Sequence, residues 1–490
     1  MNIDLVTDYN INPEIFRAYD IRGIVDDTLT EQDVFLIGQA IGTKTLLLAK
    51  FSNKLSKQVI IGRDGRLSGV RLINQLQQGI RSTGCDVVDL GLVPTPLVYF
   101  AVNLLNISSA IMLTGSHNPP NYNGLKIILA SKAIYGAQIL ELQQIIVKQK
   151  FMQVNKDNLG KIIYKDIINE YINYISNNIN IYRHRDKPIK LVIDCGNGVA
   201  GVVAEKLFTA LGAKCITLYC EVDGNFPNHH PDPSIVENLQ ALQIAVLENS
   251  ADLGIAFDGD GDRLGVIDHN ANIICPDLYL MLFIKDLLNN YHHKNPCNSD
   301  LNIAPVIIYD IKSTNNLEKF IENLGGIPLM WKTGHSLIKA KMEETGALLA
   351  GEMSGHMFFK DRGLGFDDAL YTAARLLELI GNTKLSLYAM CVDLPRNIST
   401  PEIIISSTEI QKHIIIQKLI GIVDEKNAKI TTIDGVRLDF KDCWGLIRMS
   451  NTTPNLIARF EGINTTALSK IQKIFKDYLL TIDANLALPF

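Results

Sequence analysis

The chain has 490 residues, and at the usual domain size of roughly 100–200 residues this length predicts about three domains. Its composition, 47% hydrophobic and 20% charged, is that of a folded globular protein and excludes a disordered or collagen-like chain. Lys and Arg number 47 and Asp and Glu 52, so the net charge is −5 and gives no reason to expect a nucleic acid as partner.

The N-terminus and the cysteines predict a cytoplasmic protein. Residues 1–5 show no basic segment leading into the apolar stretch of a secretory signal. The most apolar segment, 278–288, is interrupted by Lys285 and Asp286, so we expect no membrane span. The eight cysteines have neither C-x-x-C nor zinc-site spacing, and we expect free thiols. The histidine pairs 229–230 and 292–293 are expected in solvated loops, not at a metal.

One pattern of elements occurs three times along the chain. A short β-branched strand ends in an aspartate and a turn, at 59–65, 191–196 and 307–310. Helical spacing of apolar residues follows, at 70–80, 202–211 and 317–324. A second strand comes next, at 86–90, 214–219 and 327–331. A third apolar strand then ends in a polar, glycine-containing loop, at 114–119, 258–263 and 351–356.

This alternation predicts an α/β fold with largely parallel strands in mixed sheets. In such sheets ligands bind at the carboxyl ends of the strands, so three unusual loops at equivalent places are a functional signal. The last hundred residues differ, because they read as paired strands, a further strand and an amphipathic helix, at 437–448, 455–461 and 466–480. They predict a separate small α+β domain that begins after a linker at 394–397.

We therefore expect four domains, and the resemblance described below implies that each contributes one loop to a central cleft. Three similar α/β domains span 1–163 with the serine loop, 164–272 with the aspartate loop and 273–393 with the third loop. The α+β domain spans 394–490.

The aspartate loop predicts a cation site. Asp258, Asp260 and Asp262 alternate with glycines, which let the backbone fold tightly enough for alternate carboxylates to converge. Hard oxygen ligands favour Mg²⁺ or Ca²⁺. An EF-hand is excluded because its sixth and twelfth positions hold Arg263 and His269 in place of Gly and Glu. Three ligands leave room for a phosphate oxygen, and Arg263 is suited to bind a phosphoryl group.

The serine loop is ambiguous by itself. Ser116 follows the apolar strand 110–113 and stands in a tight turn. Asn118 replaces the second glycine of G-x-S-x-G, so a hydrolase elbow is disfavoured. Adjacency to His117 does not make a base–nucleophile pair, and an ordinary turn serine stays an alternative.

Four motifs together resemble the signatures of the α-D-phosphohexomutases, in that family's order. They begin at residues 114 (T-G-S-H-N-P-P-x-Y-N-G-x-K), 258 (D-G-D-G-D-R), 351 (G-E-M-S-G-H) and 448 (R-M-S-N-T-T-P). The segments 16–23 and 331–335 match as well. The usual serine loop has Ala at the position of Gly115. Met353 stands where phosphoglucosamine mutases have Gln, so the resemblance is closest to the bacterial phosphomannomutase/phosphoglucomutase branch.

This resemblance implies a phosphoryl transfer through Ser116, carried as a phosphoserine. A mannose or glucose 1-phosphate would take that phosphoryl on O6, and the bound 1,6-bisphosphate would turn around. Its other phosphate would return to Ser116, and the 6-phosphate would leave. One Mg²⁺ per chain would be held by Ser116, Asp258, Asp260 and Asp262, and glucose 1,6-bisphosphate would act as activator.

The resemblance also implies roles for other residues. Positive charge at the transfer centre would come from Arg22, Lys126 and Arg263. The phosphate that is not transferring would bind to Arg448, Ser450, Asn451 and Thr452. Sugar hydroxyls 3 and 4 would contact His335, Glu352 and Ser354, with further substrate contacts from Tyr19 and Lys312. His356 is a candidate for proton transfer, while the sequence does not identify the general base.

Three alternatives stay open at this stage. The first is phosphoglucosamine mutase, against which Met353 argues. The second is a non-enzymatic sugar-phosphate or Ca²⁺ binding module, and the third is a phosphatase that uses the same metal and serine. In the favoured interpretation the partners are hexose phosphates of carbohydrate metabolism, without nucleic acid or membrane, and the chain is a monomer or weak homo-oligomer.

Overall fold

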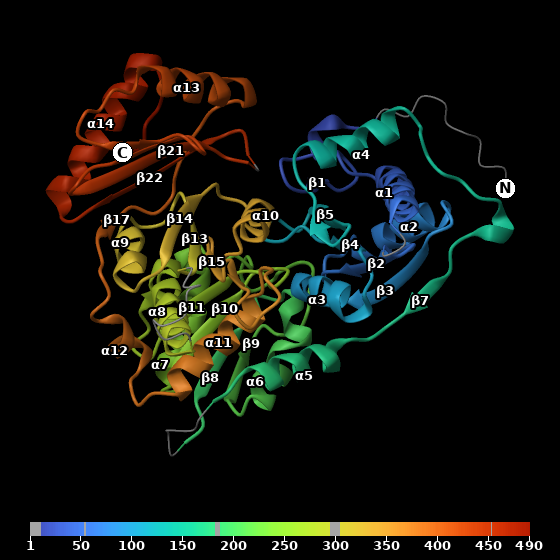
Figure 1. Ribbon diagram of the computed structural model, residues 1–490, viewed down its shortest axis with the longest axis horizontal. Coiled ribbons are helices and arrows are strands. Elements are labelled where there is room, and N and C mark those ends of the chain that lie inside the picture. The colour runs from blue at the N-terminus through green and yellow to red at the C-terminus, as the bar shows by residue number, and fades with distance from the viewer. Residues whose placement is uncertain (1–10, 53–54, 182–186, 295–303, 452) are drawn as a thin grey trace. The chain divides into compact units, whose positions relative to one another are not determined.

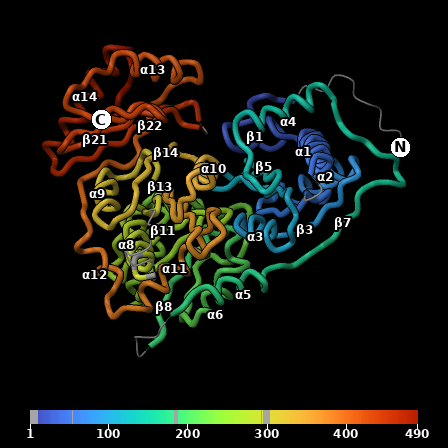
Figure 2. The backbone as a smooth tube through the Cα atoms, viewed as in Figure 1, coloured from blue at the N-terminus to red at the C-terminus, as the bar shows by residue number. Residues whose placement is uncertain are grey.

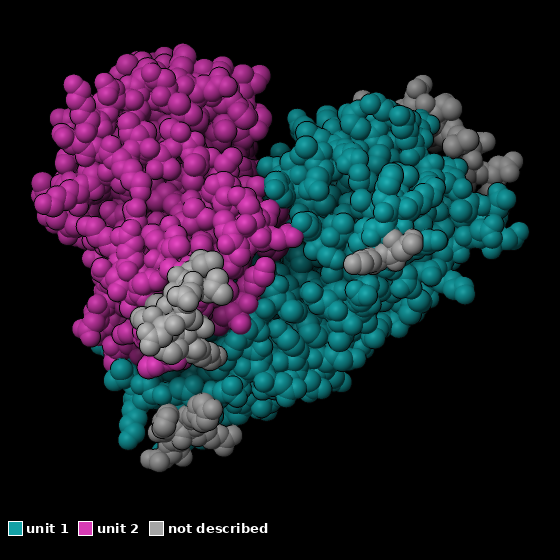
Figure 3. Space-filling view, in the orientation of Figure 1, with its two compact units in different colours: residues 1–274, 354–358, 362–388 teal, residues 275–353, 359–361, 389–490 magenta. Residues whose placement is uncertain are grey.

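A computed structural model describes residues 11–52, 55–181, 187–294, 304–451 and 453–490. The expectations for residues 1–5, Cys297 and Thr452 therefore lie outside the described residues. The chain divides into two compact units, drawn in teal and magenta in Figure 3. Unit 1 comprises residues 1–274, 354–358 and 362–388, and unit 2 comprises residues 275–353, 359–361 and 389–490.

The first sheet of unit 1 has the strand order β1-β5-β4-β2-β3-β7, with β6 paired to β5 (Figure 1). Its parallel strands are β2 (Gln58–Arg63), β3 (Asp86–Leu92), β4 (Ser109–Leu113) and β7 (Ile162–Tyr164). Its antiparallel strands are β1 (Ile21–Ile24), β5 (Tyr122–Leu129) and β6 (Lys132–Ala133). Lys126 on β5 pairs with Met112 on β4, which places the lysine near the end of β4 that leads to the serine loop.

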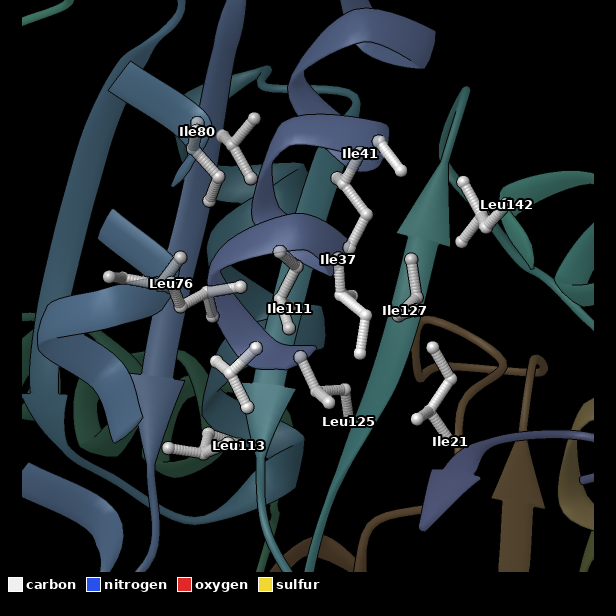
Figure 4. Close-up of a cluster of buried hydrophobic side chains, with 14 of the residues drawn as sticks. Ile21, Ile37, Ile41, Leu76, Ile80, Ile111, Leu113, Leu125, Ile127 and Leu142 are labelled. Carbon is white, nitrogen blue, oxygen red and sulfur yellow. The ribbon is translucent and has the colours of Figure 1, made fainter. Parts of the chain in front are cut away.

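Helices cover both faces of this sheet. One face packs against α1 (Glu31–Phe51), α2 (Gly69–Arg81) and α4 (Ala137–Val147), and the other against α3 (Thr95–Leu105), itself packed on α5 (Ile168–Asn178). Figure 4 shows the first core, where Ile37 of α1 and Leu76 of α2 meet Ile111 of β4. Burial of each such side chain contributes about 1.5–3 kcal/mol.

The helix α1 is long and apolar enough to cross a membrane by length and composition, with a mean hydropathy of 1.3 over its best window. It is the one helix in the described ranges that meets this test. However, 56% of that window is buried inside the protein, and Val34, Ile37 and Ile41 are fully buried in the core of Figure 4. Within unit 1, α1 therefore serves as a core helix.

The second sheet of unit 1 has the order β12-β11-β10-β8-β9. Its parallel strands are β8 (Lys190–Asp194), β9 (Lys214–Leu218) and β10 (Leu253–Phe257), and its antiparallel strands are β11 (Leu264–Asp268) and β12 (Ile273–Ile274). It packs against α6 (Ala204–Ala210), α7 (Gln240–Glu248) and α11 (Ala369–Gly381). Short 3-10 helices of unit 1 are η1 (Pro13–Ile15), η2 (Lys156–Asn158), η3 (Val199–Val202) and η4 (Val236–Leu239).

Unit 2 begins with a third parallel arrangement of strands, traced in yellow in Figure 2. Here β13 (Val306–Asp310) lies between β14 (Ile327–Trp331) and β15 (Leu349–Gly351). The helices are α8 (Pro276–Lys294), α9 (Asn316–Asn323) and α10 (His335–Thr345). The chain passes between the units in β16 (Met357–Phe359) and in α12 (Leu387–Cys391).

The C-terminal sheet of unit 2 has the order β17-β22-β21-β20-β19, with β18 paired to β22, and its pairs are antiparallel. The strands are β17 (Ile398–Ser399), β18 (Ile403–Ile405), β19 (Lys429–Thr431), β20 (Val436–Asp439), β21 (Cys443–Met449) and β22 (Leu456–Gly462). The helices α13 (Glu409–Ile422) and α14 (Thr465–Ile482) share a hydrophobic core with it. On β20, Arg437 donates to the carbonyls of Ile311 (2.6 Å) and Ser313 (2.8 Å), just after β13.

These elements confirm the predicted fold class of three α/β domains with mixed sheets and a further C-terminal region that contains a sheet. Each of the three repeated strand–helix–strand segments forms where it was expected. The loop prediction for His292–His293 is wrong, because both residues belong to α8. The boundaries of the four domains and their common cleft stay predictions.

Candidate active site

The serine loop leaves β4 and holds Ser116 in a left-handed backbone conformation, with φ at 49°. The Ser116 amide donates to Thr114 Oγ1 (2.8 Å), and the residue is buried. Ser116 Oγ lies 3.1 Å from His117 Nδ1 and 3.1 Å from Asp258 Oδ2. The hydroxyl of the serine loop thus reaches a carboxylate of the aspartate loop.

The two loops approach so closely that a side chain at Gly259 has no room. A Cβ built there would lie 2.4 Å from the carbonyl oxygen of Ser116. In the aspartate loop, Asp258 Oδ1 accepts the amides of Asp262 (3.0 Å) and Arg263 (3.1 Å), so the loop curls around its first carboxylate. Glycine at 259 is therefore what lets the carboxylates stand beside the serine hydroxyl.

Asp258, Asp260 and Asp262 are fully buried and bring one carboxylate oxygen each within 4.8 Å of one another. Burial raises the pKa of Asp258 well above its ordinary value, and the charges of Asp262 and Asp260 raise it further. Among the described residues, no hydrogen-bond partner faces the buried Asp260 Oδ1. Three hard oxygen donors, one of them unsatisfied, fit a divalent cation of the Mg²⁺ type.

A second cluster shares Asp262. Its ligand atoms come from Asp262, His356 and Asp367, which are all buried. His356 Nε2 lies 3.1 Å from Asp262 Oδ1, and Nδ1 lies 2.8 Å from Ser354 Oγ. The predicted proton-transfer histidine therefore contacts one predicted metal ligand and one predicted sugar contact.

Three cationic side chains gather in the same part of unit 1. Lys126 Nζ donates to Asp260 Oδ2 (2.6 Å) and to Asp262 Oδ2. Arg22 donates to Asn118 Oδ1 (2.6 Å), and among the described residues neither Arg22 Nε nor Arg263 Nε has a hydrogen-bond partner. A buried N–H group without a partner lowers the stability of a folded protein, and a bound anion could accept from either arginine.

The charges of these groups shift the pKa values of neighbouring side chains. Burial would lower the pKa of Lys126, but the charges of Asp260 and Asp262 outweigh it and raise that pKa well above its ordinary value. Burial and the charges of Arg263 and Arg22 lower the pKa of His117 well below its ordinary value. The lysine is thus a permanent cation, and the imidazole beside Ser116 is neutral. Tyr19 is half-buried and stands three residues before Arg22.

Unit 2 holds the remaining sugar-contact residues. Glu352 follows β15, is buried, and accepts the amide of Gly334 at 2.6 Å. That bond fixes the residue immediately before His335, the first residue of α10. His335 Nδ1 in turn lies 3.2 Å from Lys339 Nζ. Glu352 and His335 are therefore brought together, as one sugar pocket would require.

Lys312 lies two residues after β13, and its Nζ donates to Glu402 Oε1 at 2.6 Å. Burial would lower the pKa of Lys312, but the charges of Glu402 and Asp310 raise it. The Lys312 ammonium lowers the pKa of Glu402 to about 2. The predicted substrate lysine is thus paired with a carboxylate that the sequence analysis did not single out.

The predicted phosphate loop follows β21. Arg448 Nε donates to Asp434 Oδ2 at 3.1 Å, and the same oxygen accepts the amide of Thr333 at 3.2 Å. Ser450 Oγ accepts the amide of Thr453 at 3.1 Å, which makes a turn. Asn451, half-buried in this turn, adjoins Ser450 in the chain.

Comparisons with known proteins identify the family of the chain. Family models described as "Phosphoglucomutase/phosphomannomutase, alpha/beta/alpha domain I", "domain II" and "domain III" match residues 13–153, 169–271 and 275–398, well over half of the chain. The chain belongs to the phosphoglucomutase/phosphomannomutase family.

Named relatives of this family are similar along almost their whole length. The phosphomannomutase/phosphoglucomutase of Pseudomonas aeruginosa is 49% identical over 476 residues, which cover 97% of each chain. The phosphoglucomutase of Neisseria gonorrhoeae is 46% identical, over 95% of this chain and 97% of that protein. A crystal structure of a phosphoglucomutase/phosphomannomutase family protein from Burkholderia thailandensis superposes with a TM-score of 0.87 at 44% identity and covers 97% of this chain and 99% of that chain.

The sequence analysis noted the aspartates at the ends of the three repeated first strands but gave them no part in the candidate site. In the structure Asp64, Asp194 and Asp310 are each buried and bonded to neighbouring loops. Their recurrence at equivalent positions was the available signal. Arg66, Glu402 and Asp434 carried no such signal, because their partners are distant in the sequence.

Proposed function

We propose that this protein is a phosphotransferase isomerase that interconverts hexose 1-phosphates and hexose 6-phosphates, with mannose and glucose phosphates as substrates. The observation that carries this proposal is the Ser116 hydroxyl, 3.1 Å from Asp258 within a buried cluster of three carboxylates. Around it lie Lys126 and the Nε–H groups of Arg22 and Arg263, which have no hydrogen-bond partner in the described part of the chain. This arrangement suits a phosphoryl group on the serine, which needs charge neutralisation more than covalent assistance.

In the proposed reaction, phosphorylated Ser116 is the donor. The Oγ–P bond breaks as the sugar O6–P bond forms, and the resulting 1,6-bisphosphate turns around so that its other phosphoryl returns to Ser116. Arg22, Lys126 and Arg263 stabilise the negative charge of the phosphoryl group in flight. His356, which contacts Ser354 and Asp262, would relay a proton.

The aspartate loop is proposed to hold one Mg²⁺ with Asp258, Asp260, Asp262 and an oxygen on Ser116. When bound, the ion would neutralise charge on the phosphoryl group. The buried Asp260 Oδ1, which has no hydrogen-bond partner among the residues that the structure describes, supports a cation there. Glucose 1,6-bisphosphate is the expected activator, because it would restore the phosphoserine.

The remaining predicted residues are proposed to bind the rest of the substrate. Arg448, Ser450, Asn451 and Thr452 would take the phosphate that is not transferring. His335 and Glu352 would contact sugar hydroxyls together with Ser354, and Lys312 and Tyr19 would add substrate contacts. Contacts limited to hydroxyls 3 and 4 would tolerate both mannose and glucose.

We keep the division at 1–163, 164–272, 273–393 and 394–490 as part of the proposal. The protein is expected to act in the cytoplasm as a monomer or weak homo-oligomer, without nucleic acid or membrane. Phosphoglucosamine mutase is the alternative, and Met353 together with the names of the relatives argues against it.

A coupled assay tests the proposal. With glucose 1,6-bisphosphate and Mg²⁺, the protein should convert mannose 1-phosphate and glucose 1-phosphate faster than glucosamine 1-phosphate. Ser116→Ala should lower kcat by more than about a thousandfold, because the carrier hydroxyl is lost. Faster turnover of the amino sugar would favour the alternative, release of inorganic phosphate in place of isomer would indicate a phosphatase, and near-normal activity of Ser116→Ala would contradict the mechanism.

A further inference from the structure

The serine loop needs support from outside itself. The left-handed region is unfavourable for a non-glycine residue, and Ser116 has a φ of 49°. The hydrogen bonds within the loop run from the Ser116 amide to Thr114 Oγ1 (2.8 Å), from the Asn118 amide to the Gly115 carbonyl (2.9 Å) and from the Tyr122 amide to the Pro119 carbonyl (3.0 Å). These bonds leave the carbonyls of Ser116, His117 and Asn118 to be satisfied by another part of the chain.

Arg66 donates to two of those carbonyls, and His230 Nε2 lies at hydrogen-bond distance from the third, that of His117. Its side chain is buried. Nη2 donates to the carbonyls of Ser116 (2.8 Å) and Asn118 (2.6 Å). Nη1 donates to the carbonyls of Tyr122 (2.9 Å) and Pro119. One rigid guanidinium thus binds four points along the loop and fixes its curvature.

The fifth N–H group of the guanidinium donates to Asp64, which also holds the serine loop. Arg66 Nε donates to Asp64 Oδ2 at 3.2 Å, and this oxygen also accepts Thr114 Oγ1 at 2.7 Å. Because Thr114 Oγ1 accepts the Ser116 amide, Asp64 holds the loop from one side while Arg66 holds it from the other. With all five donors used on the protein, Arg66 has none left for a phosphate, in contrast to Arg22 and Arg263.

Gly115 lets the guanidinium lie flat against the loop. A Cβ built on Gly115 would lie 2.4 Å from Arg66 Cζ and 2.5 Å from Nε, which is far inside contact distance. The ring of Phe226 lies 5.4 Å from Arg66 Cζ, a cation–π distance. The guanidinium therefore cannot move aside to admit a methyl group without breaking bonds to the loop.

We propose that Arg66 is a positioning residue for phosphoryl transfer: through the loop carbonyls it aims the Ser116 hydroxyl at the Asp258 carboxylate, and Gly115 provides its space. This inference rests on the proposed function of Ser116. Arg66 touches no reacting atom, and its effect reaches the chemistry only through the direction of Ser116 Oγ.

The test compares Arg66→Lys, Gly115→Ala and the control Arg71→Lys with the wild-type protein. Arg71 lies on α2, outside the site, and forms exposed ion pairs with Asp26 and Glu31, so its variant should behave as wild type. Arg66→Lys keeps the charge and loses the fork. Gly115→Ala keeps the guanidinium and displaces it, so the proposal stays testable if the lysine variant folds poorly.

Both site variants should lower kcat by about 10- to 100-fold, the usual effect of a displacement near 1 Å, while KM for glucose 1-phosphate changes less than about twofold. The rate at which glucose 1,6-bisphosphate phosphorylates Ser116, followed by intact mass, should fall in proportion. Mg²⁺ affinity, measured by calorimetry, should fall by much less than kcat, because Asp258, Asp260 and Asp262, three of the four proposed ligands, are unchanged. Wild-type kcat in both variants, or a loss of Mg²⁺ affinity as large as the loss of kcat, would overturn the proposal.

A second readout separates this inference from the proposed function. Amide hydrogen exchange over residues 114–122 should speed up by about tenfold or more in both variants and not in Arg71→Lys. This measurement needs no turnover. If wild-type protein lacks mutase activity, the proposed function fails while faster exchange still supports the role of Arg66 in holding the loop; unchanged exchange would contradict that role even in an active enzyme.

Discussion

At the scale of single residues, buried acceptors decide which side chains carry charge. His229 lies with Nε2 at 3.1 and 3.0 Å from the two oxygens of Asp194, and with Nδ1 at 3.0 Å from the His230 carbonyl. Both ring nitrogens therefore face acceptors, and only the protonated imidazole can donate to both. Burial would lower the pKa of His229, but the hydrogen bond and charge of Asp194 outweigh it and raise that pKa above 6.5.

This pair predicts a pH-dependent stability. Because the folded pKa is raised, the stabilisation is fully present below pH 6.5, the ordinary value, and is lost as pH rises through the folded pKa. Urea unfolding from about pH 6 to pH 9 should show wild type losing more free energy of unfolding than His229→Gln. Parallel pH profiles for the two proteins would show that the ion pair contributes nothing.

Residues of the site were predictable where short motifs carry them. The three aspartates of one loop needed only their spacing with glycine, and Ser116 needed the resemblance of its surrounding motif. The roles of Arg66 and Asp434 could not be predicted, because an arginine or an aspartate in an ordinary turn gives no indication of its partner. Only folding brings Ser116 to Arg66 and Arg448 to Asp434. Pairing between segments 50 residues apart, as for Arg66 and Ser116, is not encoded in local pattern.

At the scale of elements, α1 and α2 pack unusually closely. A Cβ on Gly79 of α2 would lie 2.1 Å from the Phe35 carbonyl of α1, and one on Gly38 would lie 2.7 Å from the Leu76 carbonyl. The apolar spacing over 70–80 predicts the helix itself but not this contact. Glycine lowers helix propensity, so its presence inside α2 makes sense only once the neighbouring backbone is seen.

A pair of glycine variants separates packing from propensity. Gly79→Ala should lower the free energy of unfolding by about 1–3 kcal/mol, since the added methyl pushes the helices apart. Gly421→Ala in α13 is the matched change, where nothing lies within 4 Å of the new Cβ, and it should raise stability by about 0.4–1 kcal/mol. Chemical denaturation of both variants measures this, and equal effects would refute the packing argument.

At the scale of the whole molecule, the division into two units separates the predicted roles. Unit 1 contains the serine loop and the aspartate loop, while unit 2 contains Glu352 and the loop after β21. The sequence anticipated the threefold repetition and the distinct C-terminal region, because these follow from local periodicity. It did not anticipate that the chain would return to unit 1 for α11, since that depends on contacts such as Tyr171 Oη to Asp368 (2.8 Å).

This division predicts how a metal should act on unfolding. In scanning calorimetry, Mg²⁺ should raise the midpoint of the transition that includes unit 1 and leave that of unit 2 nearly unchanged. At a hundredfold excess over Kd the stabilisation is about 2.7 kcal/mol. Asp260→Asn should abolish the shift, while Asp157→Asn, on an exposed 3-10 helix, should preserve it. A shift retained by Asp260→Asn would place the cation elsewhere.

The contact between Gly115 and Arg66 also has a consequence for the history of such sequences. Alanine at 115 and arginine at 66 in its present conformation exclude each other, because 2.4 Å cannot separate two carbon atoms that are not bonded. A lineage that exchanges glycine for alanine here must therefore also move the guanidinium, either by a local shift of the Arg66 side chain or through a change elsewhere around it. Substitutions at Gly115 should thus be accompanied by a different arrangement of Arg66 against the loop.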